Sequence, residues 1–244
     1  MGSALFTPLE LRSLHLQHRG WVSPMCQYSC GPETGEGVPN DWHLMHLGSF
    51  ATGGAALILT EAAAVNAAGR ISPRDAGLYN DDQAAAWERI TAFVHRHGPA
   101  ETKIGTQLAH AGRKASSYWP FSGQKGTVAA ADGGWPTVGP GTSALDGYDA
   151  PSALSEQEID GVIADFAAAA ERAVGAGFDT IEIHGAHGYL LHQFQSPLVN
   201  DRTDRWGGDE AGRNRLTLAV VDAVRNVIPD SMPLLLRISA SDWA

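Results

Sequence analysis

Short apolar runs alternate with longer amphipathic segments along the whole chain. Five of the runs have the length and composition of buried strands, and they cover residues 21–25, 56–60, 103–108, 180–184 and 234–239. Strands that alternate with helices are usually parallel, because each helix carries the chain back across the sheet. The pattern therefore predicts a fold of the α/β class.

Four of the intervening segments repeat apolar residues at helical spacing. The clearest begins at Ser155, where Glu158 three residues later completes a capping box, and Gly175 and Gly177 mark its end. The other three segments cover residues 82–98, 214–227 and, more weakly, 43–53. These segments predict the crossover helices.

Both a doubly wound sheet and a (β/α)₈ barrel fit alternating strands and helices. A dinucleotide-binding sheet should carry G-x-G-x-x-G after its first strand, whereas here the first strand leads into the sequence SPMCQY at 23–28. Residues 114–151 form a long stretch rich in Gly, Pro, Ser and Trp that follows the third strand. On a TIM barrel that loop would overhang the active-site face, so the sequence favours the barrel.

The composition agrees with a barrel and limits the possible partners and location of the protein. The chain has 244 residues, 43% of them hydrophobic, which suits one barrel domain spanning residues 1–244. A formal net charge of −10 argues against nucleic acid or an anionic membrane as the main partner. The chain has no apolar run of about 18 residues and no signal-peptide pattern, so we expect a cytoplasmic protein. Cys26 and Cys30 are expected to be reduced thiols.

The sequence HGAHGY at 184–189 carries the most specific chemistry. His184 ends the fourth predicted strand, where barrel enzymes place catalytic groups, and the glycines allow a turn that brings His187 close. Two imidazoles can direct two N–H donors at one carbonyl or nitro oxygen, and Tyr189 can donate a proton nearby. The alternatives are a metal pair, which lacks further ligands and leads us to expect no metal site, or buried polar residues with structural partners.

Two polar residues interrupt apolar strands. Gln107 lies in the third strand and Arg237 in the fifth, and both need partners if they are buried. The partner of Arg237 is either a buried carboxylate, such as Glu182 or Glu61, or the pyrimidine edge of a flavin. At the end of the first strand, Cys26 is either a small apolar filler or a polarisable group beside that flavin.

Together these segments resemble the Old Yellow Enzyme family of flavin-dependent ene-reductases, almost from end to end of the chain. The matching blocks are SPMCQY at 23–28, LTEA at 59–62, QLAHAGR at 107–113, EIHGAHGYLL at 182–191 and RIS at 237–239. Cys26 with Tyr28 resembles the thermophilic-like bacterial branch of the family.

The resemblance implies FMN at the C-terminal mouth of the barrel and NAD(P)H as the reductant. Carried over residue by residue, the flavin contacts would be Ser23, Pro24, Met25, Cys26, Ala62, Gln107 and Arg237. The small-molecule substrate, an electron-poor alkene, would bind through His184 and His187 and face Tyr28, and Tyr189 would protonate it. The resemblance further implies a homo-oligomer for the full-length protein.

The family's barrel continues for three more strands, whereas this sequence stops just past its fifth. The resemblance therefore implies a fragment or a truncated chain with about the first five strands, lacking the loops that hold the FMN phosphate. Two alternatives stay open at this point. One is a half-barrel that is inactive on its own, and the other is the barrel part of an enzyme like 2,4-dienoyl-CoA reductase.

Overall fold

A five-stranded parallel sheet forms the centre of the protein, whose computed structural model describes residues 3–99 and 101–243. The strand order is β3-β4-β5-β8-β9, and every neighbouring pair is parallel. The bounds are Trp21–Val22 (β3), Leu57–Ala64 (β4), Lys103–Ala109 (β5), Thr180–Gly185 (β8) and Leu234–Ile238 (β9). All five predicted strands are therefore present, in the order of a barrel rather than of a doubly wound sheet.

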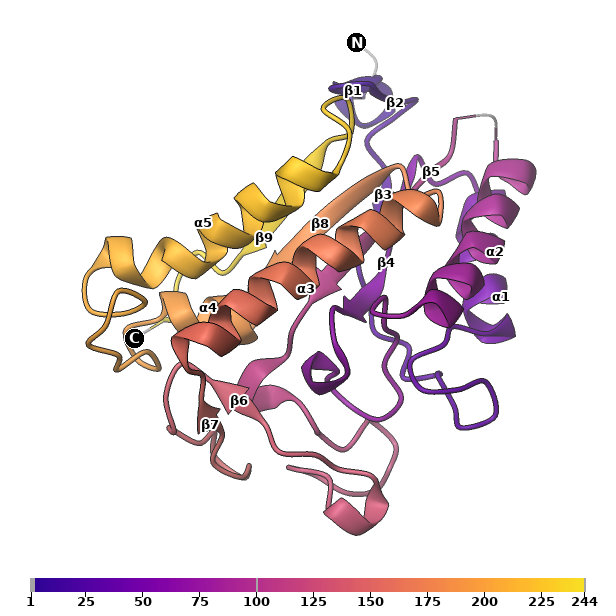
Figure 1. Ribbon diagram of the computed structural model, residues 1–244. Helices are drawn as coiled ribbons and strands as arrows, with labels where there is room; N and C mark the ends of the chain where they lie inside the picture. The colour runs from indigo at the N-terminus through magenta and orange to yellow at the C-terminus, as the bar shows by residue number, and fades with distance from the viewer. Residues whose placement is uncertain (1–2, 100, 244) are drawn as a thin grey trace.

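The crossover helices pack along the sheet (Figure 1). They are α1 (Asp41–Thr52), α2 (Asp81–His97), α3 (Glu156–Gly175) and α5 (Glu210–Val227). The predicted capping box is confirmed: Ser155 Oγ accepts the Glu158 N–H, and the Glu158 carboxylate accepts the Ser155 N–H. Helix α5 starts four residues earlier than predicted, because the Asp209 side chain caps it and accepts the Gly212 N–H.

Two strand boundaries differ from the prediction by more than one residue. Strand β3 ends at Val22, since residues 23–28 leave the sheet. Strand β4 continues to Ala64 instead of ending at residue 60, and all eight of its residues are buried. Its pairing with β5 changes register between Leu59 and Ala62, so one extra residue is accommodated there as a β-bulge.

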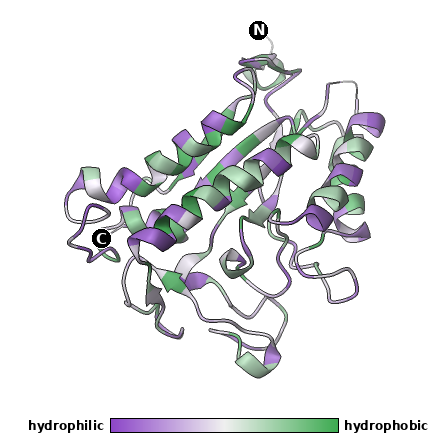
Figure 2. Cartoon of the chain, in the orientation of Figure 1, coloured by the Kyte–Doolittle hydropathy of each residue, from purple (hydrophilic) through white to green (hydrophobic). Residues whose placement is uncertain are grey.

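The core lies between the sheet and the helices. Trp87 of α2 and Phe166 of α3 are fully buried against apolar strand residues such as Ile104, Ile181 and Ile183. Hydrophobic residues concentrate along the strands, whereas hydrophilic residues are interspersed along the helices (Figure 2). Within the described ranges, no helix is long and apolar enough to cross a membrane.

The two ends of the sheet differ. At the end where the strands start, the antiparallel hairpin of β1 (Leu9–Leu11) and β2 (Leu14–Leu16) packs on Leu57. The opposite end carries the long loops (Figure 1). They hold the short parallel pair β6 (Val138–Gly139) and β7 (Ser152–Ala153) and helix α4 (Leu190–Gln195). They also hold 3₁₀ turns at Ala67–Gly69, Gly112–Lys114 and Ala130–Asp132, whereas a further 3₁₀ turn, Ala4–Phe6, lies near the N-terminus.

Candidate active site at the carboxyl ends of the strands

Strand register brings the predicted cofactor-binding residues of β4, β5 and β9 to one face of the sheet. Ala62 is paired with Gln107, and Gln107 with Glu182, while His184 is paired with Arg237. Residues opposite one another in neighbouring strands share a face, and so do residues two apart along a strand. Ala62, Gln107, His184 and Arg237 therefore point to the same side, near the carboxyl ends of their strands.

Gln107 has a protein partner that the sequence did not reveal. Its Nε2 donates to Glu182 Oε1 at 2.6 Å across the β5–β8 pair. Burial raises the pKa of Glu182, and the Gln107 hydrogen bond and the Arg237 charge oppose that rise. No carboxylate oxygen of the described residues lies within 4 Å of the Arg237 guanidinium, so the buried-carboxylate alternative for Arg237 is not supported by a direct ion pair.

The turn after β8 brings His184, His187 and Tyr189 together as predicted. The His184 ring lies with its centroid 4.9 Å from each of the other two rings, at interplanar angles of 84° and 82°. His184 Nδ1 accepts the Ala186 N–H at 3.2 Å. Because a neutral imidazole carries one proton, this leaves the proton on Nε2 as a free donor.

Both imidazoles are neutral near pH 7. Burial, followed by the charges of His187 and Arg237, lowers the pKa of His184 to about 3. Burial also lowers the pKa of His187, and Arg237 and Lys114 lower it further. Two neutral N–H donors flanked by fixed cations favour an oxygen on which negative charge develops.

Tyr189 and Tyr28 line one cleft beneath the long loop. The same cleft is lined by Lys114, Trp119 and Tyr148. Burial is the main cause that raises the pKa of both Tyr28 and Tyr189, and nearby acidic groups add to it. Tyr189 therefore keeps its proton at neutral pH, as a proton donor must.

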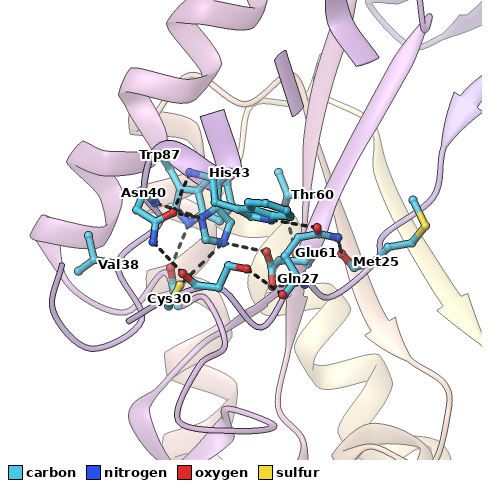
Figure 3. Close-up of polar contacts among 12 residues, drawn as sticks. Met25, Gln27, Cys30, Val38, Asn40, His43, Thr60, Glu61 and Trp87 are labelled. Carbon is cyan, nitrogen blue, oxygen red and sulfur yellow. Dashed lines mark hydrogen bonds and ion pairs between the residues drawn. The ribbon is translucent and has the colours of Figure 1, made fainter. Parts of the chain in front are cut away.

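Gln27, in the segment at 23–28, contacts a buried polar network that includes Glu61 and His43 (Figure 3). Glu61, placed at the β4 bulge, accepts the Gln27 N–H at 3.1 Å, and its other carboxylate oxygen lies 3.0 Å from His43 Nε2. His43 Nδ1 in turn accepts the Asn40 N–H at 3.0 Å, so its proton is on Nε2, which also lies 3.9 Å from Cys30 Sγ. This network fixes the backbone next to Cys26.

Cys26, Glu61 and Asp75 form a compact group, with one polar atom of each lying within 4.8 Å of the others. Burial strongly raises the pKa of the Cys26 thiol, and Asp75 and Glu61 raise it further. Glu61 Oε2 accepts the Gln27 N–H and Asp75 Oδ2 accepts from Ser72, whereas Glu61 Oε1, which lies 3.0 Å from His43 Nε2, has no hydrogen-bond partner among the described residues. Asp75 Oδ1 is likewise buried without a partner among the described residues, and burial, with Glu61 adding to it, raises the pKa of Asp75 to about 7.

Three of these contributors were not predicted from the sequence. Asp75, Lys114 and His43 reach the site through loops or a helix, and nothing in their local pattern distinguishes them from surface residues. The free thiols of Cys26 and Cys30 agree with expectation. Ser23 and Met25 are exposed, and they line a small pocket with His43 and Glu61, apart from the tyrosine cleft.

Comparison with known proteins decides the family. Residues 4–244 match the model of the NADH:flavin oxidoreductase / NADH oxidase family. The chain belongs to this family.

Its relatives include curated proteins and solved structures. The chain is 44% identical to an NADH:flavin oxidoreductase of Gibberella zeae, with 98% of this chain and 57% of the relative aligned. It is 42% identical to an NADPH dehydrogenase of Listeria monocytogenes, with 99% and 65% aligned. The chain thus spans about 57 to 65% of the length of these curated family members.

The fold of the family members agrees with the sheet described above. Morphinone reductase superposes with a TM-score of 0.80 at 31% identity, covering 96% of this chain and 62% of that one. The old yellow enzyme homologue of Zymomonas mobilis gives a TM-score of 0.82 at 29% identity, covering 97% and 63%. The five parallel strands and their helices are therefore part of a (β/α)₈ barrel, as predicted.

Proposed function

We propose that this chain acts in an FMN-dependent oxidoreductase that uses NAD(P)H to reduce carbon–carbon double bonds conjugated to a carbonyl or nitro group. The observation that carries the proposal is the arrangement of His184, His187 and Tyr189 at the end of β8, beside the face that presents Arg237. The names of the relatives, NADPH dehydrogenase and morphinone reductase, support it.

The residues present fit a flavin. Gln107 and Arg237 lie on one face with Ala62, and the Arg237 guanidinium has no carboxylate within 4 Å among the described residues. We propose that these side chains and residues 23–26 hold FMN, with Arg237 opposite the pyrimidine edge, where a cation stabilises a reduced, anionic flavin. When bound, FMN would accept hydride from NAD(P)H and deliver it to the alkene.

The protein's own contribution would be to polarise the substrate and supply a proton. His184 and His187 would donate to the carbonyl or nitro oxygen, so that negative charge formed there during reduction is stabilised by neutral donors that need no reorganisation. Tyr189, which keeps its proton, would deliver it to the carbon next to that group. NAD(P)H and the alkene would occupy the cleft beside Tyr28 in turn, which is a ping-pong sequence.

Kinetics of the two half-reactions test these roles in the FMN-loaded protein. His184→Ala or His187→Ala should slow flavin reoxidation by 2-cyclohexenone and by a nitroalkene about 10²–10³-fold. Tyr189→Phe should slow the enone more than the nitroalkene, because a nitronate is stable enough to leave unprotonated. His97→Ala, an exposed residue on α2, is the matched control and should behave as wild type.

Two outcomes would overturn the proposal. One is a folded full-length protein that takes up no FMN, as measured by the chromophore released on denaturation. The other is a Tyr189→Phe variant that stops reoxidation by both substrates while the two histidine variants react at wild-type rates.

We also propose a cytoplasmic, self-associating protein. Free thiols at Cys26 and Cys30 fit a reducing compartment. Self-association is proposed for the full-length protein, as the resemblance to the family implies. Size-exclusion chromatography with light scattering tests this, and a monomer at all concentrations would refute it.

A further inference from the structure

The turn that carries His187 and Tyr189 has an unusual backbone. His187 and the following Gly188 both have positive φ, of +60° and +72°. A residue other than glycine in this left-handed region is disfavoured and persists only where surrounding contacts hold it. The direction of the His187 and Tyr189 side chains therefore depends on whatever fixes this turn.

Hydrogen bonds with four side chains hold the backbone of the turn, and one of them runs from Gln193 Nε2 to the Gly188 carbonyl at 2.7 Å. The Gly188 N–H donates to His192 Nδ1 at 2.8 Å, and the His187 N–H donates to Ser239 Oγ at 3.0 Å. On the other side, Lys114 Nζ donates to the His187 carbonyl at 2.8 Å. Together these bonds fix the peptide groups on both sides of His187.

His192 is itself oriented by a carboxylate from the segment after β9. Its Nε2 lies 2.9 Å from Asp242 Oδ1, and the other Asp242 oxygen accepts the Ser196 hydroxyl at 2.6 Å. Because Nδ1 accepts the Gly188 N–H, the ring proton is on Nε2 and faces Asp242. The two side chains are partly exposed, with 14% of His192 and 26% of Asp242 accessible to solvent.

We infer that His192 and Asp242 are positioning residues for the proposed reaction: they fix the Gly188 amide, and through it the placement of His187 and Tyr189. The effect of these residues on the reaction rate rests on the proposed function, whereas their effect on the position of the turn does not. Asp242 keeps one tautomer of His192, and that tautomer offers the acceptor that the strained turn requires. A misplacement of about 1 Å in such a site costs on the order of 10² in rate.

Three variants of His192 separate positioning from a general structural role. His192→Asn keeps an acceptor near the Nδ1 position and should hold the Gly188 N–H. His192→Gln keeps a donor near the Nε2 position but loses the acceptor, and His192→Leu loses both. His95→Asn is the matched control, because His95 Nε2 forms a similar contact with Asp179 at 2.8 Å on α2, away from the turn.

Long-range ¹H–¹⁵N NMR of the 244-residue chain reports on the imidazoles without requiring turnover. We expect His192→Leu and His192→Gln to shift and broaden the His187 ring signals, and His192→Asn and His95→Asn to leave them near their wild-type positions. With FMN bound, enone-driven flavin reoxidation should fall about 10²-fold in the Leu and Gln variants. It should fall less than about fivefold in the Asn variant, a rescue that a packing role would not give.

Wild-type His187 signals and wild-type rates in the Gln variant would overturn the inference, as would a loss in the Asn variant equal to that in the Gln variant. If the Leu variant fails to fold, the comparison of the Asn and Gln variants still decides. If the wild-type protein reduces no enone with FMN and NADPH, the proposed function fails, and the NMR comparison alone decides whether His192 places the turn.

Discussion

Asp75→Asn should make the protein more stable at alkaline pH, and the size of the effect follows from where Asp75 lies. The carboxyl is 1% exposed and has one oxygen without a partner among the described residues. Burial raises its pKa from 3.8 to about 7, Glu61 adds to the rise, and the Ser72 hydrogen bonds and Arg70 oppose it. Asparagine has nearly the same shape and carries no charge, so its amide can accept from Ser72 and direct its N–H₂ toward Glu61 or Cys26.

The sign follows from proton linkage. Between the unfolded and folded pKa values the native state holds a proton that the unfolded chain has released, so Asp75 lowers the stability of the native state progressively as pH rises from about 4 to about 7. Each pKa unit corresponds to about 1.4 kcal/mol, so the total loss is on the order of 4 kcal/mol above pH 7. The asparagine side chain does not titrate, so the advantage of Asp75→Asn should grow over the same interval.

Urea unfolding at pH 5, 6, 7 and 8.5 measures this difference. We expect the free energy of unfolding of Asp75→Asn, relative to wild type, to increase by about 2–4 kcal/mol between pH 5 and pH 8.5. Asp222→Asn, an exposed substitution on α5, should show no such trend. A difference between Asp75→Asn and wild type that stays constant with pH would show that Asp75 is ionised throughout and that the reasoning is wrong.

Two further predictions concern the cap of α3 and the thiol of Cys26. Ser155→Ala removes the cap of α3 and should lower the free energy of unfolding by about 1 kcal/mol in urea titrations, whereas Ser155→Asp should retain stability. Cys26 should react slowly with iodoacetamide at pH 8, because burial raises its pKa and Asp75 and Glu61 raise it further. Mass spectrometry should show faster alkylation of Cys26 in Asp75→Asn than in wild type, and equal rates would contradict this prediction.

The fold was predictable because its signals are local. The Ser155–Glu158 capping box and Gly175 lie at the ends of one helix, and the capping partners are only three residues apart. Strand ends were less predictable. The run at 56–60 continues to Ala64 because pairing with β5 resumes after the bulge. The bulge depends on the pairing with β5, so the local sequence of β4 does not predict it.

In the candidate site, too, contacts within one turn were predictable from the sequence and contacts between strands were not. His184, His187 and Tyr189 come from one turn, so their spacing in the sequence already placed their rings together. The Gln107–Glu182 bond joins residues 75 apart, and only the register of β5 and β8 creates it. Residue types could show that Gln107 needed a partner, but not which carboxylate would provide it.

The charges around the site would act differently on the two kinds of group in the proposed reaction. Burial lowers the pKa values of both imidazoles, and Arg237 and Lys114 lower them further, so the rings stay neutral beside positive charge. Burial raises the pKa of Tyr189, and Cys26, Tyr28 and Asp75 add to the rise. In the proposed reaction, negative charge that forms on a bound oxygen would thus be stabilised at the histidines, whereas Tyr189 would retain its proton until a carbanion is there to take it.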